Sequence, residues 1–143
     1  MDRIKECIFC KIVAGKAPAD IIYRDGLSTV ILDQDWAVLG HALVIWNEHH
    51  RNASDLTEEE YTQFSRVYHR AETALLEMTK SEKAVTLKSG GLVEHFHYHI
   101  YPVNTDTTWQ QVQDIFNKKV KVQISNEDRS SFVANLTSKL TLS

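Results

Sequence analysis

Hydrophobic and polar residues alternate along several short stretches of the chain, and they recur at helical spacing along one long stretch. Five short stretches are apolar or alternating, with turn signals between them: residues 21–23, 28–33, 41–47, 83–88 and 94–103. Between the third and the fourth, apolar residues recur every three or four positions from Tyr61 to Met78. Strands on both sides of one long helix favour an α+β fold with antiparallel strands over a parallel sheet.

Local signals support the predicted helices. Thr57 and Glu60 can form a capping box at the start of the long helix. A short helical turn is predicted near the N-terminus, and Gly15 and Pro18 end it. The chain is therefore expected to have a short helix before its first strand and a long helix after its third.

The residues from 103 to 143 have weaker patterns. Apolar residues share one face in 109–116 and again in 132–140, which predicts two helices. The alternating residues 120–124 predict a short strand between them. We interpret the whole chain, 1–143, as a single domain with its core in residues 7–102 and a helical C-terminal extension.

Composition and charge narrow the classes of function. The chain has 143 residues, of which 43% are hydrophobic and 24% charged, as expected of an ordinary globular domain. The net charge is −3 and basic residues are dispersed, which disfavours a nucleic-acid polymer as partner but allows a small nucleotide. No stretch approaches the ~20 apolar residues of a membrane span, and the first residues lack the apolar run of a signal peptide. We expect a soluble cytoplasmic protein.

Three of the seven histidines alternate with aromatic residues in the stretch EHFHYHIYP. In a strand, His95, His97 and His99 point to one face, while Phe96 and Tyr98 point to the other. One interpretation is a solvated polar face, although histidine has no particular strand propensity. The others are a metal centre, and catalysis in which one imidazole attacks an electrophile while a neighbour moves protons.

Cys7 and Cys10 form a Cys-x-x-Cys pair near the N-terminus. A disulfide across two intervening residues would close a very small loop and stabilise little. In a cytoplasmic chain this spacing more often binds a metal or performs redox chemistry. Redox chemistry requires an exposed thiol of low pKa, and the residues between the sulfurs are apolar, so metal binding is the favoured hypothesis.

Three blocks of the sequence together resemble the histidine triad (HIT) family. Residues 95–101 match the family's alternation of histidines with apolar residues, and CIFCKIVAGKAPADIIYRD resembles the N-terminal pattern of its zinc-bearing branch. The third block is ILD followed by GHALVIWNEHHRNASDLTEEE. The resemblance implies a HIT-like fold, with a five-stranded antiparallel sheet, one long helix and a short N-terminal helix; it does not cover the extension 103–143.

The resemblance also implies a nucleotide hydrolase or nucleotidyl transferase. Such an enzyme acts on the α-phosphate of a nucleoside phosphoramidate or a dinucleoside polyphosphate, and a purine nucleotide is the expected substrate. By motif position His97 is the nucleophile that forms a covalent nucleotidyl-histidine, and His99 orients it or shares the proton transfer. His41 matches a further active-site histidine, and Asp33 matches the acid that binds ribose hydroxyls. A covalent step would divide one difficult displacement into two easier ones.

A structural zinc ion and a homodimer are also implied by the resemblance. The implied zinc ligands are Cys7, Cys10, His49 and His95, a closed Cys₂His₂ set. The competing hypothesis is a hydrolytic zinc held by the three triad histidines. The long helix and the triad side of the sheet are the expected dimer contacts.

The chain departs from the family pattern just before and just after the triad. Leu92 stands where Ser or Thr is common, Gly91 stands where Gln is common, and the usual Arg after Pro102 is missing. Glu94 is unusual and is expected to alter the charge of the pocket. These departures predict weak hydrolysis or a different leaving group, and they motivate an alternative: a nucleotide-binding or regulatory protein with little catalysis.

Overall fold

The computed structural model describes residues 6–88 and 93–142, so the turn predicted at 89–91 and the substitution at Leu92 lie outside the described residues. The helices are α2 (Ile8–Val13), η1 (Ala53–Asp55), α3 (Glu58–Thr79), α4 (Trp109–Phe116) and α5 (Asn126–Leu142). The strands are β1 (Asp20–Arg24), β2 (Ser28–Leu32), β3 (Ala42–Trp46), β4 (Lys83–Lys88) and β5 (His97–Val103).

The five strands form one sheet in the order β1-β2-β3-β5-β4, and all neighbours are antiparallel. The predicted α+β fold is therefore confirmed. The central pair β3 and β5 is far apart in sequence, and its register places Leu43 opposite His99 and Ile45 opposite His97. The triad strand β5 consequently lies inside the sheet, between the edge strand β4 and the fully buried central strand β3.

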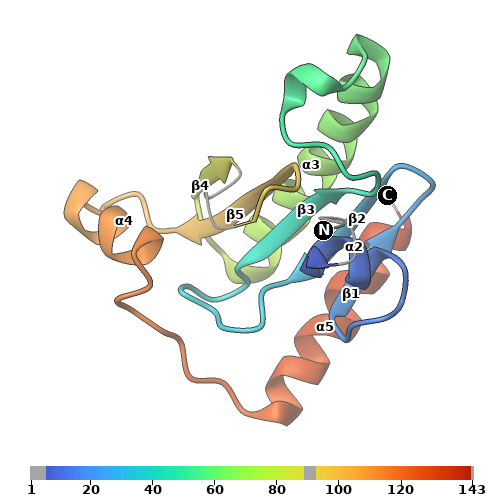
Figure 1. Cartoon of the computed structure of the whole chain (residues 1–143). Helices are drawn as coiled ribbons and strands as arrows, with labels where there is room; N and C mark the ends of the chain where they lie inside the picture. The colour runs from blue at the N-terminus through green and yellow to red at the C-terminus, as the bar shows by residue number, and fades with distance from the viewer. Residues whose placement is uncertain (1–5, 89–92, 143) are drawn as a thin grey trace.

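Helices cover the two faces of the sheet unequally (Figure 1). α3 and α5 pack on one face, and the larger core lies there: it includes Val30, Leu32, Val44, Phe64, Phe96, Leu75 and Leu136. The short helix α2 packs on the other face, where a smaller cluster includes Phe9, Ile12, Ile31, Leu43 and Ile45. Successive residues of β2 and β3 thus serve opposite faces, as strand geometry requires. The less covered face holds the candidate functional residues.

The helix α3 begins as predicted. The backbone N–H of Glu60 donates to Thr57 Oγ1 at 3.1 Å, and the N–H of Thr57 donates to Glu60 Oε1 at 2.8 Å. This reciprocal capping box satisfies donors that the first turn of a helix leaves unpaired. The helix ends at Thr79, and the residue that caps it, Lys80, has its backbone in the left-handed region with φ of 55°. None of the helices in the described part of the chain is long and apolar enough to cross a membrane.

The triad strand is shorter than the sequence predicts. We expected a strand over 94–103, but β5 begins at His97. Immediately before it, the N–H of Phe96 donates to the carbonyl oxygen of His50 at 2.7 Å, in the loop that follows β3. This bond pulls the chain around the end of β3, so His95 lies in a bend and not in the strand.

The C-terminal extension contains both predicted helices but not the predicted strand. Residues 120–124 lie outside any strand, and Val122 makes a single backbone bond to the carbonyl oxygen of Trp36 at 2.8 Å. The alternation instead reflects Val122 and Ile124 packing against the main core while their neighbours face solvent. The extension then returns as α5 beside β1 (Figure 1).

Candidate active site and metal centre

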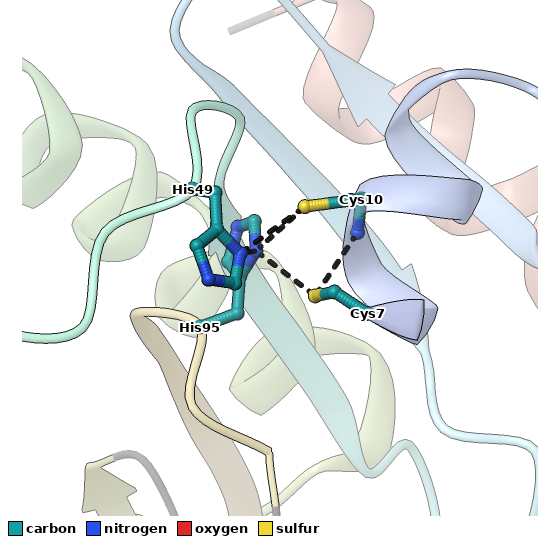
Figure 2. Close-up of side chains that lie close together, drawn as sticks. All are labelled: Cys7, Cys10, His49 and His95. Carbon is teal, nitrogen blue, oxygen red and sulfur yellow. Dashed lines mark hydrogen bonds between the residues drawn. The ribbon is translucent and has the colours of Figure 1, made fainter. Parts of the chain in front are cut away.

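Two cysteines and two histidines meet on the α2 side of the sheet (Figure 2). Cys7 Sγ lies 3.3 Å from His95 Nδ1, and Cys10 Sγ lies 3.2 Å from His49 Nδ1. The two Nδ1 atoms are 3.2 Å apart. Neither cysteine forms a disulfide. Four soft or borderline ligand atoms therefore face one another, each from a different position in the chain.

Local structure explains why these four side chains converge. Cys7 caps the start of α2, and its Sγ accepts from the N–H of Cys10 at 3.4 Å, which places both sulfurs on the same side of the first turn. His49 comes from the loop after β3, and His95 comes from the bend before β5. The cluster thus joins three segments that the sheet alone does not hold together.

The spacing of the four ligand atoms is compatible with a tetrahedral metal site. Ligands at the usual zinc distances, about 2.3 Å for sulfur and 2.0 Å for nitrogen, are separated from one another by roughly 3.3–3.8 Å. The observed separations of 3.2–3.5 Å approach this range. The other ring nitrogen of His95, Nε2, bonds the carbonyl oxygen of Trp46, which directs Nδ1 towards the cysteines. Burial lowers the pKa of His95 to about 4, so the imidazole is neutral and can act as a ligand. These residues could hold a metal ion.

His97 is arranged differently from His95. It is 2% exposed, and its Nδ1 bonds the carbonyl oxygen of His95. Because a carbonyl only accepts, Nδ1 carries the proton and the lone pair of the neutral ring is on Nε2. Burial is the main cause that lowers the pKa of His97, so the ring is neutral near pH 7. The edge of Phe9 packs against this ring at a centroid distance of 4.6 Å.

His99, His41 and Asp33 form a chain of polar groups beside His97. The rings of His97 and His99 are 5.1 Å apart between centroids, and His99 Nδ1 lies 3.0 Å from His41 Nε2. Asp33 Oδ2 lies 3.7 Å from the same nitrogen of His41. Burial lowers the pKa of both His41 and His99 to about 3, so each is a neutral hydrogen-bonding group. Such a group can orient or relay a proton without adding charge.

His41 is held in place by the backbone before it. Gly40 has φ of +80°, and a Cβ atom there would lie 3.0 Å from Thr79 Cγ2 and 3.1 Å from Phe132 Cζ. Only glycine fits this conformation and this space. The carbonyl oxygen of His41 also accepts from the N–H of Asp33 at 2.9 Å. Asp33 and His41, which lie in separate sequence motifs, are therefore held together by this backbone bond.

His97 and His99 line a cavity of about 580 Å³. One part of its wall is apolar and comes from α2, β2 and β3: Ile8, Phe9, Ile12, Ile31 and Leu43. The polar part includes Asp33, His97, His99, Lys118 and Arg129. A cavity of this size with an apolar part and a few convergent polar groups is typical of a small-molecule site.

The comparison with known families agrees with this geometry. The HIT domain matches residues 14–106, which is more than half of the chain. This chain belongs to the HIT family.

Two HIT relatives are similar in sequence. A Bacillus subtilis protein named hit is 33% identical over 107 residues, which are 71% of this chain and 74% of that protein. An adenosine 5'-monophosphoramidase of Schizosaccharomyces pombe is 33% identical over 101 residues, which are 67% of this chain and 73% of that enzyme.

A solved HIT structure bears on the metal cluster. A Zn-bound histidine triad family protein from Mycobacterium smegmatis has a TM-score of 0.73 and 26% identity to this chain. The match covers 97% of this chain and 96% of that one. The Cys₂His₂ cluster described above is consistent with the zinc-bearing branch of the HIT family.

The structure separates some residues that the sequence groups together. Among the described residues, His95 belongs to the cysteine cluster. His99 belongs to a different group of possible metal ligands, together with Asp33 and His41. No centre built from all three triad histidines is found in the described part of the chain. Glu94 is also not where we expected it: it is exposed, 3.4 Å from Arg51, and it does not line the cavity.

Other residues of the HIT cavity were missed by sequence reasoning. Phe9 contacts both His95 and His97. Its position between the two cysteines was the available signal that it lies near the histidines. Lys118 and Arg129 come from the C-terminal extension, outside the range that matches the HIT domain. No local motif marks either of them.

Proposed function

We propose that this protein is a nucleotide hydrolase or nucleotidyl transferase that works through a covalent nucleotidyl-histidine on His97. The observation that carries the proposal is the bond from His97 Nδ1 to the carbonyl oxygen of His95, because it leaves the lone pair on Nε2 of a ring that lines the cavity. Imidazole is a competent nucleophile when neutral and correctly oriented. The substrate class is a nucleoside phosphoramidate or a dinucleoside polyphosphate.

The proposed reaction has two displacements at the α-phosphorus. In the first, Nε2 of His97 forms a bond to phosphorus while the bond to the leaving group breaks with its electron pair. In the imidazolium that results, Nδ1 keeps its proton and donates it in a hydrogen bond to the carbonyl oxygen of His95, which stabilises the positive charge. In the second, water or another acceptor attacks phosphorus, the P–N bond breaks and His97 returns to its neutral form. Hydrolysis yields the nucleoside monophosphate and the protonated leaving group.

The neighbouring residues have supporting roles in this proposal. His99 and His41, 3.0 Å apart, move the protons that the leaving group gains and the attacking water loses. The Asp33 carboxylate accepts from ribose hydroxyls, since it lines the cavity close to His41. The apolar wall formed by Phe9 and Ile31 suits the faces of a purine base.

We further propose that the cysteine cluster holds a structural zinc ion. Cys7, Cys10, His49 and His95 would complete a closed tetrahedron, which leaves no position for a substrate or a water. When bound, zinc would fix the start of α2 and the bend before β5, and so hold Phe9 against His97. The homodimer that the HIT resemblance implies stays a prediction; in the described residues β4 is an edge strand that pairs only with β5.

The test is turnover by the variant His97→Ala. Wild-type protein is expected to release AMP from adenosine 5'-monophosphoramidate or from a diadenosine polyphosphate, and the variant to lose at least about 10⁴-fold in kcat/KM. His69→Ala is the matched control, because His69 is exposed on α3 and does not line the cavity. Unchanged turnover in His97→Ala would contradict the mechanism. Nucleotide binding without turnover by the wild type would favour the alternative of a regulatory HIT protein.

A further inference from the structure

The C-terminal extension contributes part of the cavity wall. Phe116, Lys118 and Arg129 line the cavity, and all three lie beyond residue 106, where the match to the HIT domain ends. Phe116 approaches from α4, with its ring centroid 5.5 Å from that of Tyr101, and Tyr101 stacks 5.6 Å from His99. The extension therefore reaches the side of the cavity on which His99 lies.

The positive charge of Arg129 is already engaged by protein groups. Its Nε donates to Asp20 Oδ2 at 2.8 Å, and a terminal nitrogen donates to the carbonyl oxygen of Asp33 at 2.7 Å. The guanidinium also lies over the ring of Trp36, 4.8 Å from the centroid. Arg129 thus holds the end of β2 in place and has little charge to offer a ligand.

Lys118 is placed differently. It follows α4 with a left-handed backbone, φ of 57°, and its N–H donates to the carbonyl oxygen of Ile115 at 3.1 Å, which fixes the start of its side chain. In the described ranges, 6–88 and 93–142, no carboxylate lies within ion-pair distance of its ammonium group. Lys121, three residues later, does have such a partner in Asp35 at 3.1 Å.

The charge of Lys118 acts on the histidines. Its positive charge is one of the causes that lower the pKa values of His41 and His99. Asp33, His41 and His99 lie close enough together to be considered for a cation, but the positive charge of Lys118, which lines the same cavity, opposes a divalent ion there. The same charge favours an anion on this side of the cavity.

We propose that Lys118 is a specificity-determining residue that binds the anionic leaving group of the nucleotide. The inference rests on the proposed function of the cavity. A polyphosphate or sulfate group that departs from the α-phosphorus carries its own negative charge, and Lys118 is placed to attract it beside His99. When the P–N bond of a phosphoramidate breaks, the nitrogen takes up a proton and leaves as an uncharged amine, which is attracted less by the ammonium of Lys118. The extension would thus select nucleotides with an acidic leaving group.

The test compares two substrates in the wild-type chain and in Lys118→Met, which keeps the length of the side chain. The KM for diadenosine tetraphosphate is expected to rise roughly five- to tenfold, and that for adenosine 5'-monophosphoramidate less than about twofold. The difference should shrink at high ionic strength, and Lys118→Arg should restore most of the affinity. Lys119→Met is the matched control, because Lys119 is exposed like Lys118 but does not line the cavity. Equal changes for both substrates, or the same change in the control, would overturn the inference.

A binding measurement separates this inference from the proposed catalysis. Calorimetry with ATP and AMP needs no turnover, and Lys118→Met should weaken ATP binding roughly fivefold more than AMP binding. That result would support the role of Lys118 even if the wild type hydrolysed neither substrate. An unchanged ratio of the two affinities would overturn the inference while leaving His97 catalysis intact. Failure of the wild type to bind either nucleotide would overturn both proposals.

Discussion

His95 and His97 are two residues apart, both nearly inaccessible to solvent, and yet they belong to sites of opposite kind. The backbone decides between them. The carbonyl oxygen of Trp46 bonds Nε2 of His95, which directs Nδ1 of that ring towards the cysteines. The carbonyl oxygen of His95 instead bonds Nδ1 of His97, so the lone pair of that ring is on Nε2. One histidine completes a closed cluster and the other lines an open cavity. The two identical side chains therefore present different ring nitrogens to their surroundings, because each bonds a backbone carbonyl through the other nitrogen.

The largest effect on the closed cluster is expected from Cys7→Ser. The substitution removes one thiolate ligand of the proposed zinc, so we expect the metal to be lost and the free energy of unfolding to fall by roughly 3 kcal/mol or more. Turnover at low temperature should fall much less than in His97→Ala, because the cavity side chains remain. Chemical denaturation and metal analysis on the same samples check this. A variant that kept full stability without metal would show that the cluster does not hold the three segments together.

A second prediction concerns how the stability contributed by His41 and His99 depends on pH. The pKa of His41 and of His99 is about 3 in the folded protein and near 6.5 in an unfolded chain, so the unfolded state takes up protons first as the pH falls. Their contribution to stability is therefore complete above pH 6.5 and is lost as the pH falls from there towards 3. The loss should be about 1–3 kcal/mol per pH unit for the two together.

Variants isolate this contribution from that of the carboxylates. His41→Asn should make the dependence of unfolding free energy on pH shallower between pH 6.5 and 4, whereas the exposed His69→Asn should not. Urea denaturation at a series of pH values measures both slopes. Equal slopes in the wild type and in His41→Asn would mean that His41 is not held neutral by burial.

The smallest effect is expected from Arg129→Met. The substitution removes the bonds to Asp20 and to the carbonyl oxygen of Asp33, so the free energy of unfolding should fall by about 1–2 kcal/mol. KM should rise about threefold with kcat almost unchanged, since Asp33 is displaced but the histidines are not. Lys139→Met is the control, because Lys139 pairs with the exposed Glu77 and should cost less than about 0.5 kcal/mol. An equally large rise in KM in the control would contradict a specific role of Arg129 in positioning Asp33.

Much of the sheet and of α3 could be predicted from the sequence because those elements carry local signals. The capping box at Thr57 and the alternation around Tyr98 depend on neighbours close in the chain. The family motif placed His97 and Asp33 in one site, and the cavity does bring them together. The local pattern predicted the wrong structure where tertiary contacts dominate. Residues 120–124 alternate but pack along the core without a strand partner. His95 lies outside the strand because the neighbouring Phe96 bonds to the loop after β3.

The role of Arg129 could not be predicted because its partners are distant in the chain. Asp20 and Asp33 precede it by 109 and 96 residues, and nothing in the sequence around it indicates which strand α5 will meet. The same holds for Lys118, whose position depends on where α4 ends. Residues of this kind become visible only when the extension is seen beside the sheet.

The cysteine cluster is proposed to bind zinc while His97 performs catalysis. This assignment is tested most directly by measuring zinc content and turnover on the same preparations of His97→Asn and His49→Asn. His97→Asn should retain one zinc ion per chain and lose turnover, because His97 is outside the cysteine cluster. His49→Asn should lose the zinc and keep measurable turnover, since the cavity histidines are unchanged. Loss of zinc in His97→Asn, or abolished turnover in a folded His49→Asn protein, would contradict the account.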